Sequence, residues 1–140
     1  MKIVVPLDMS DTANRAIELG ADIAKGLGDR VLLVTVSGQR LRSDLAPLAE
    51  AEGVPVPEMI EAFLKSTVAE LDGVDADYVV ISGENAPESL VDFVQTDDDV
   101  RMIVMATHGR TGIEKWRLGN VTEKVVRHSE VPVTVVPKPR

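Results

Sequence analysis

The chain alternates short apolar runs with segments of helical periodicity, and this alternation limits the possible fold more than any other feature of the sequence. Because strands that alternate with helices favour parallel pairing and right-handed crossovers, the pattern predicts an α/β fold. The run at residues 30–36 is apolar nearly throughout, as expected for a strand covered by helices on both faces. We therefore predict an open, doubly wound, five-stranded parallel sheet with helices on both faces and strands at residues 2–7, 30–36, 76–81, 100–105 and 131–136.

Helical spacing of apolar residues predicts four helices between these strands. The first has a narrow face of small residues, with Ser10 as a candidate N-cap and with Gly26 and Gly28 at its end. Residues 37–57 are broken up by glycine and proline, so we predict a loop there, with one short helix at most. The four helices are expected at about residues 13–24, 59–71, 87–94 and 121–128.

A chain of 140 residues is long enough for one domain with a real core and too short for two. We therefore expect residues 1–140 to fold as a single domain. Cysteine is absent from the sequence, which removes disulfides and thiol catalysis and fits a reducing compartment. The sequence does not open on a signal-peptide pattern, and no apolar run approaches the roughly 18 residues that span a bilayer. These features favour a soluble, cytoplasmic protein without membrane insertion.

The charge distribution favours a small anionic ligand over a nucleic acid. A net charge of −8 argues against a nucleic-acid surface, because phosphate backbones are bound mainly through clustered lysines and arginines. The segment 108–128 stands out against this background, since it holds five of the fifteen basic residues. They are Arg110, Lys115, Arg117, Lys124 and Arg127.

The loop between the fourth predicted strand and the last predicted helix has the features of a phosphate site. It contains Gly109, Gly112 and Gly119, which let a ligand approach the backbone closely. The start of the following helix offers unpaired N–H groups and the positive end of the helix dipole. Together with the basic residues, these features predict phosphate binding. The alternative is an ordinary glycine-rich connection.

This loop resembles the glycine motif of the universal stress protein family, which reads Gly-x2-Gly-x9-Gly followed by Ser or Thr. Gly109 and Gly119 match the second and third glycines of the motif. Ala106 stands at the first position and Asn120 at the last. Asn120 still offers a polar side chain at a helix start, whereas Ala106 adds a methyl group where the family brings backbone close to the nucleotide.

The resemblance extends beyond the loop. Residues 3–8 and 131–136 also fall in family order, so it covers nearly the whole chain. It implies the strand order 3-2-1-4-5, in which the first and fourth strands lie side by side. Ligands in such sheets bind outside the carboxyl ends of the strands, where the strand order reverses. Asp8 and Ala106 would therefore face each other across the site.

The family resemblance implies that the ligand is an adenine nucleotide, ATP, ADP or AMP, with Mg²⁺ as an optional companion of its phosphates. No residue is expected to be catalytic, and Asp8 would meet a metal only as phosphate-bound magnesium. The implied binding residues lie after the first, second and fourth strands and at the start of the last helix. They are Pro6, Leu7, Asp8, Val36, Met105, Ala106, His108, Gly109, Arg110, Gly112, Gly119, Asn120, Val121 and Thr122.

Several residues near this site also have a purely structural interpretation. Asp8 is either a turn residue or an acceptor for a ribose hydroxyl. Asn120 and Glu123 fit a capping box, which would compete with a phosphate for the same N–H donors. His108 has neither a nucleophile nor an orienting carboxylate beside it in the motif, which favours packing or ligand contact over catalysis. For Trp116, a surface flap, a ligand lid and a dimer contact all remain open.

Taken together, the residues and the resemblance favour a regulatory or stress-protective module that binds adenine nucleotide and is not an efficient enzyme. One alternative is a slow ATPase or phosphotransferase at the same site. Others are a family member that has lost nucleotide and acts as a dimeric interaction module, and an unrelated flavodoxin-like binder of another phosphorylated ligand.

The last predicted strand also bears on assembly. In the implied strand order, residues 131–136 form an exposed edge rich in β-branched residues. Such an edge invites pairing with another chain unless it is protected. We therefore predict a homodimer in which two copies of this strand meet near a two-fold axis.

Overall fold

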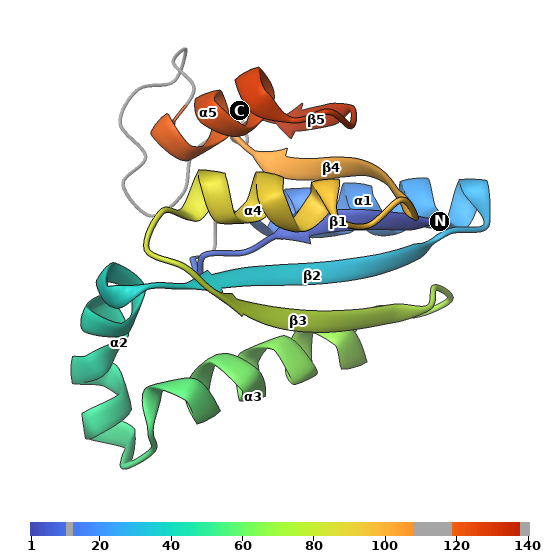
Figure 1. The fold of residues 1–140 in the computed structure, drawn as a ribbon. Helices are drawn as coiled ribbons and strands as arrows, with labels where there is room; N and C mark the ends of the chain where they lie inside the picture. Colours follow the sequence, from blue (N-terminus) through green and yellow to red (C-terminus); the bar gives the residue numbers. More distant parts are fainter. Residues whose placement is uncertain (11–12, 108–118, 138–140) are drawn as a thin grey trace.

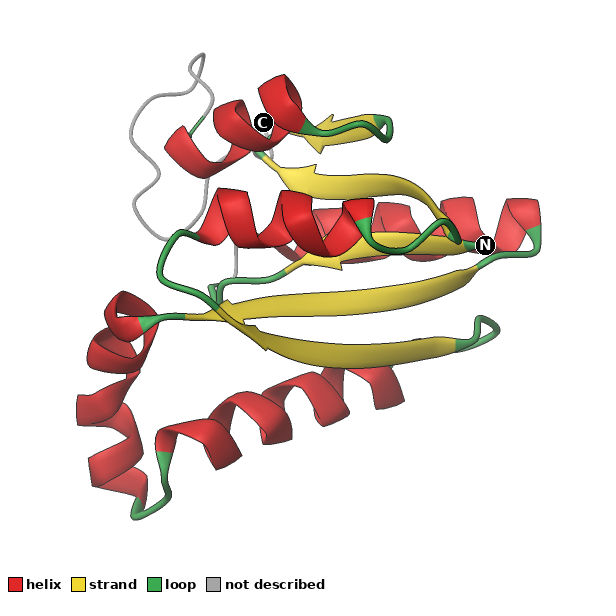
Figure 2. Ribbon diagram, viewed as in Figure 1, coloured by secondary structure: helices red, strands yellow, loops and turns green. Residues whose placement is uncertain are grey.

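A computed structural model describes residues 1–10, 13–107 and 119–137 of the chain (Figure 1). Strands and helices alternate along the chain except where two helices follow each other directly (Figure 2). None of the helices in these three stretches is long and apolar enough to cross a membrane. The elements are β1 (Lys2–Pro6), α1 (Asn14–Leu27), β2 (Arg30–Ser37), α2 (Gln39–Glu52), α3 (Val56–Ala69), β3 (Ala76–Ser82), α4 (Ala86–Gln95), β4 (Val100–Ala106), α5 (Asn120–His128) and β5 (Val133–Val136).

The five strands form one parallel sheet in the order β3-β2-β1-β4-β5, which confirms the predicted fold class and strand order. Strand β1 lies at the centre, where Val4 pairs with Leu32 of β2 on one side and with Ile103 of β4 on the other. Strands β3 and β5 are the two edges of the sheet. The chain therefore winds outward from β1 in both directions, and the order reverses between β1 and β4.

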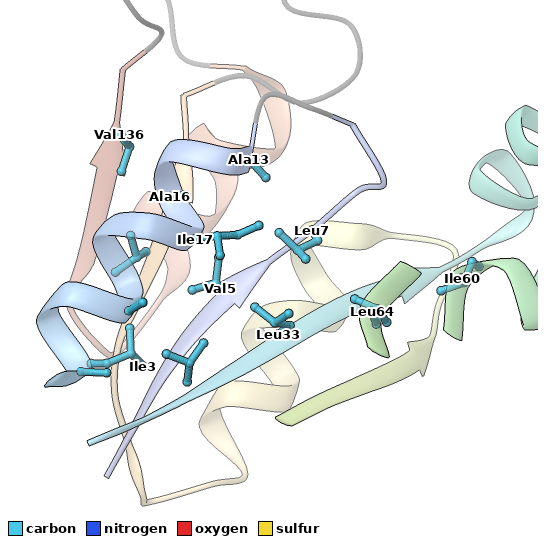
Figure 3. Packing of buried hydrophobic residues seen from close by; sticks show 14 of the residues in the cluster. Ile3, Val5, Leu7, Ala13, Ala16, Ile17, Leu33, Ile60, Leu64 and Val136 are labelled. Atoms are coloured by element: carbon cyan, nitrogen blue, oxygen red, sulfur yellow. The ribbon is translucent and has the colours of Figure 1, made fainter. Parts of the chain in front are cut away.

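Helices cover both faces of the sheet, so two layers of apolar side chains form the core. Helices α1 and α3 pack on one face, where Ile17 and Leu64 belong to the same buried cluster as Val5 (Figure 3). Helices α4 and α5 contribute Leu90 and Val125 to the cluster on the other face. This arrangement explains why the central strands are apolar on both sides, since neither face of β1 or β4 is left to solvent.

Helix α1 approaches the sheet most closely at Gly20. A Cβ atom added to Gly20 would lie 2.8 Å from Cγ2 of Val5 and 3.7 Å from Cγ2 of Ile3. Carbon atoms in favourable contact are about 3.5–4.0 Å apart, so the first of these distances leaves no room for a side chain. The small residues on the buried face of α1 are therefore a requirement of close packing on the sheet.

The segment 37–57 is more regular than predicted. It contains the fourteen-residue helix α2 and the start of α3, where a loop with one short helix was expected. Proline inside a helix removes a hydrogen bond and costs about 3 kcal/mol, yet Pro47 lies in the interior of α2. Burial of Leu41, Leu45 and Ala49 at four-residue spacing offsets this cost. Figure 1 shows α2 standing out from the end of the sheet at which β2 ends.

At the amino ends of the strands, ion pairs join segments that are distant in sequence. The Lys2 ammonium pairs with the Asp97 carboxylate. The Arg101 guanidinium forms two hydrogen bonds with Asp29, whose side chain is 3 % exposed. The hydrogen bond from Lys2 holds the pKa of Asp97 below its ordinary value, and that from Arg101 does the same for the pKa of Asp29. These pairs lie at the opposite end of the sheet from the predicted site.

We expect these pairs to make the folded state less stable in acid. A carboxyl group with a lowered folded-state pKa stabilises the fold above its unfolded pKa, and this stabilisation is lost as the pH falls through the folded value. The loss should therefore begin below about pH 4, the unfolded pKa of aspartate. Urea unfolding across this range measures it. Asp97→Asn should show a smaller loss than the wild type, and an equal loss would contradict this account.

Candidate functional site

Strands β1 and β4 pair in parallel, with Val4 opposite Ile103, so their carboxyl ends lie at the same edge of the sheet. Asp8 follows β1 closely and Thr107 follows β4 directly. After β1 the chain continues through α1 to β2, on one side of β1. After β4 it continues through α5 to β5, on the far side of β4. In doubly wound sheets this divergence opens the crevice where ligands bind. The topology therefore places Asp8 and Thr107 beyond the ends of two adjacent strands, at the same edge of the sheet.

The start of α5 is fastened to the end of β4 by two hydrogen bonds. The Gly119 N–H donates to the Thr107 carbonyl at 2.8 Å, and the Thr122 hydroxyl donates to the Ala106 carbonyl at 2.9 Å. Thr122 is only 2 % exposed, so its hydroxyl is a structural group as well as a predicted site residue. These two bonds hold Gly119 and Thr122, at the start of α5, next to Ala106 at the end of β4. All three are predicted site residues.

The capping box predicted for α5 is wrong. Gly119 is the N-cap residue and provides no capping side chain, while Asn120 is the first residue of the helix and is exposed. The Glu123 carboxylate instead accepts a hydrogen bond from Arg127 at 2.8 Å, one turn further along the helix. The register of the cap is one residue earlier than expected, because Gly119 has extended backbone angles and Asn120 is already helical. A phosphate at this helix start would therefore not compete with a side chain of Asn120 for N–H donors.

Ala106, which replaces the first glycine of the motif, has strand geometry. It is the last residue of β4, it pairs with Val136 of β5, and it is half-buried. In the part of the chain that the structure describes, Met9 is the one residue other than glycine with a positive φ. Alanine is therefore unstrained at position 106.

The turn after β1 holds Asp8 in a fixed geometry. Oδ1 of Asp8 accepts hydrogen bonds from the Ser10 backbone N–H at 3.1 Å and from the Ser10 hydroxyl at 2.5 Å. Between them, Met9 has a φ of 70°, a left-handed conformation that is unusual for a residue with a side chain. Ser10 is therefore a partner of Asp8, whereas the N-cap of α1 is Ala13. The Asp-x-Ser spacing, typical of such turns, was the signal in the sequence.

The other predicted site residues fall into three groups. Leu7 and Met105 are buried at the ends of β1 and β4, and Val121 is exposed on α5. Pro6 and Val36 are half-buried, and Val36 lies two residues beyond the pairing of Pro6 with Val34, so β2 extends past the end of β1. The predicted contacts of the central loop lie outside the described residues, as does Trp116. They are His108, Gly109, Arg110 and Gly112.

This geometry fits a small phosphorylated ligand. The start of α5 carries no capping side chain from its N-cap, β4 ends without strain at Ala106, and the Asp8 carboxylate is held in the turn after the neighbouring strand. A helix start binds anions through its N–H groups and dipole. The fold and this arrangement together define a doubly wound α/β protein with a candidate nucleotide site at its switch point.

Comparison with known proteins identifies the family within this class. Residues 1–137 match the model of the universal stress protein family, and the chain belongs to that family. It is 32% identical to the universal stress protein MJ0531 of Methanocaldococcus jannaschii over 149 residues, an alignment that covers 99% of this chain and 83% of the relative.

Solved structures agree with this assignment. The structure of the hypothetical protein MJ0577 of Methanocaldococcus jannaschii is 26% identical, with a TM-score of 0.76 and coverage of 99% of this chain and 96% of that one. A universal stress protein from Archaeoglobus fulgidus, solved in complex with dAMP, is 25% identical, with a TM-score of 0.68 and coverage of 96% of both chains.

Proposed function

We propose that this protein binds adenine nucleotide at the carboxyl ends of β1 and β4 and acts as a regulatory or stress-protective module. The observation that supports the proposal is that Gly119 and Thr122 are hydrogen-bonded to the end of β4, at the point where the strand order reverses beside β1. The dAMP complex of the Archaeoglobus fulgidus family member supports an adenine nucleotide as the ligand. In the proposed complex, Gly119 and the start of α5 receive the phosphates, with Mg²⁺ as an optional companion, and Asp8 accepts from the ribose.

The test is to identify what the purified protein carries and what it binds. Denaturation followed by mass spectrometry should release ATP, ADP or AMP, and calorimetry should show heat on adding these nucleotides to stripped protein. Another phosphorylated molecule in their place would favour a binder of a different ligand. Phosphate release above a Gly119→Val control would add slow hydrolysis to the proposal, whereas absence of bound nucleotide and of heat would refute it.

Ala106→Gly should tighten nucleotide binding by less than about tenfold, or roughly 1.4 kcal/mol. The effect is small because Ala106 has strand geometry, so glycine relieves no backbone strain and only removes a methyl group. Calorimetry with ATP on both proteins measures the ratio of dissociation constants. Clear heat for the variant and none for the wild type would mean that the natural chain has lost the ligand. The interaction-module alternative would then replace this proposal.

We also propose that the protein forms a homodimer through the edge of β5. The Ile103 N–H bonds the Pro132 carbonyl at 2.9 Å and the Thr107 N–H bonds the Val136 carbonyl at 3.0 Å. Backbone N–H and C=O groups alternate in direction along a strand, so those of Thr134 also point to β4. The backbone groups of Val133 and Val135 point to the open edge. This edge is therefore able to accept a strand from a second copy.

Val135→Pro should convert the dimer to a monomer without unfolding it. Proline removes the outward N–H of residue 135 but leaves the ladder between β4 and β5 intact. Light scattering at micromolar concentration reports the mass. Thr134→Pro is the matched control, since it removes an N–H directed at β4 and should lower stability instead. A wild-type protein that is already monomeric at this concentration would rule out the dimer.

A further inference from the structure

Along the edge formed by β3, as along that of β5, successive residues direct their backbone groups alternately to the neighbouring strand and to the open side. The Val31 N–H bonds the Asp75 carbonyl at 2.8 Å, and the Gly83 N–H bonds the Ser37 carbonyl at 3.3 Å. Odd-numbered residues in and beside β3 therefore direct their backbone groups to β2. Even-numbered residues direct theirs to the open edge, because the direction alternates along a strand. The outward-facing residues are Ala76, Tyr78, Val80 and Ser82.

One of these outward groups is occupied by a side chain of the strand itself. The Tyr78 N–H donates to Oδ1 of Asp77 at 2.7 Å. The Tyr78 hydroxyl donates to the Glu61 carboxylate of α3 at 2.9 Å, which anchors Tyr78 on the helix side of the sheet. Asp77 itself is exposed, so its charge is hydrated as long as no other chain covers the edge.

The rest of the β3 edge is suited to strand addition. The strand is seven residues long, contains no proline and includes Val80, which is 40 % exposed. Long edges with exposed apolar residues pair with other chains unless a charge, a proline or a bulge prevents it. Asp77 is a charge of this kind. On β5, by contrast, no hydrogen bond of the described side chains reaches the outward groups of Val133 or Val135.

We propose that Asp77 closes the β3 edge against strand addition by a second copy of this chain. An incoming strand would have to displace the carboxylate from the Tyr78 N–H and then remove it from water. Burial of an unpaired carboxylate is costly, and in a symmetric pair the Asp77 side chains of two copies would repel each other. The sheet therefore has one edge open to pairing and one edge that is closed, so that assembly through β5 cannot continue at β3.

The test is the size of the assemblies formed by Asp77→Val, measured by sedimentation velocity over a range of concentrations. The variant should form assemblies larger than those of the wild type, at concentrations at least about tenfold lower than the wild type would need. Asp72→Val is the matched control, because it removes the same charge at an exposed position outside the strand, and it should sediment like the wild type. A folded Asp77→Val variant that also sediments like the wild type would overturn the proposal, as would an Asp72→Val control that assembles equally.

A second variant keeps the test decisive if Asp77→Val precipitates. Val80→Pro removes an outward N–H of β3 without affecting the bonds to β2. The double variant Asp77→Val, Val80→Pro should therefore return to the sedimentation of the wild type. Association that persists in the double variant would show that the added contacts are not made along this edge, and the proposal would fail. The result does not depend on nucleotide binding.

Discussion

Gly119→Val is expected to weaken adenine-nucleotide binding by at least about a hundredfold, or roughly 2.7 kcal/mol. Gly119 is the N-cap of α5, and its N–H is bonded to the carbonyl of Thr107 at the end of β4. A branched side chain placed here meets a phosphate that approaches the helix start. The backbone of Gly119 is extended, with φ −63° and ψ 158°, so valine fits it without strain and the fold should persist.

Binding is measured by calorimetry, or by the fluorescence of Trp116, the single tryptophan of the chain. Gly119→Ala should have a smaller effect, because its side chain is smaller. Gly26→Val, in the last turns of α1, serves as the control and should bind as the wild type does. Equal affinity for ATP in Gly119→Val and the wild type would show that the phosphates bind elsewhere.

Gly20→Val should lower the free energy of unfolding by about 3 kcal/mol. The added Cβ would lie 2.8 Å from Val5 Cγ2 and 3.9 Å from Val104 Cβ, and the two γ-methyl groups would increase the crowding. Val5 and Val104 are fully buried, so the central strands have no open space into which to move. Helix α1 would have to shift away from the sheet.

Gly26→Val is the matched control for this variant. Gly26 lies in the same helix, but a Cβ added there would have no atom within 4 Å. Both substitutions exchange glycine for valine in a helix, so their difference isolates the contact with the sheet. Urea unfolding should place Gly26→Val within about 0.5 kcal/mol of the wild type. Similar stabilities for the two variants would contradict the close approach of α1.

Much of the fold was predictable from the sequence because periodicity is a local property. All five strands occur where apolar runs predicted them, with ends that differ by at most two residues. Strand β5 begins at Val133, two residues later than expected, after Pro132, which has no N–H to donate. Helix α2 was missed because proline and glycine dominate its local pattern, whereas burial against α3 and the core decides its conformation.

The candidate site was predictable in part. The strand order that places β1 beside β4 and the strand geometry of Ala106 agree with the expectations, whereas ligand binding at these strand ends stays a prediction. The cap of α5 was misassigned by one residue, since a capping-box pattern does not specify which residue leaves the helical conformation. The bonds between Ser10 and Asp8 were missed because Ser10 also fits the pattern of a helix cap.

The sequence by itself determined the alternation of strands and helices, the apolar character of the central strands and the family resemblance, because these depend on residues close together in the chain. Only the tertiary structure decided which distant groups meet. The approach of Gly20 to Val5 and the fastening of Thr122 to Ala106 depend on how a helix lies on the sheet. The direction of the Tyr78 backbone N–H, which points to the open edge of the sheet, depends on the pairing register of β3 with β2. Contacts of this kind are set by the packing of whole elements, and a local pattern carries no information about them.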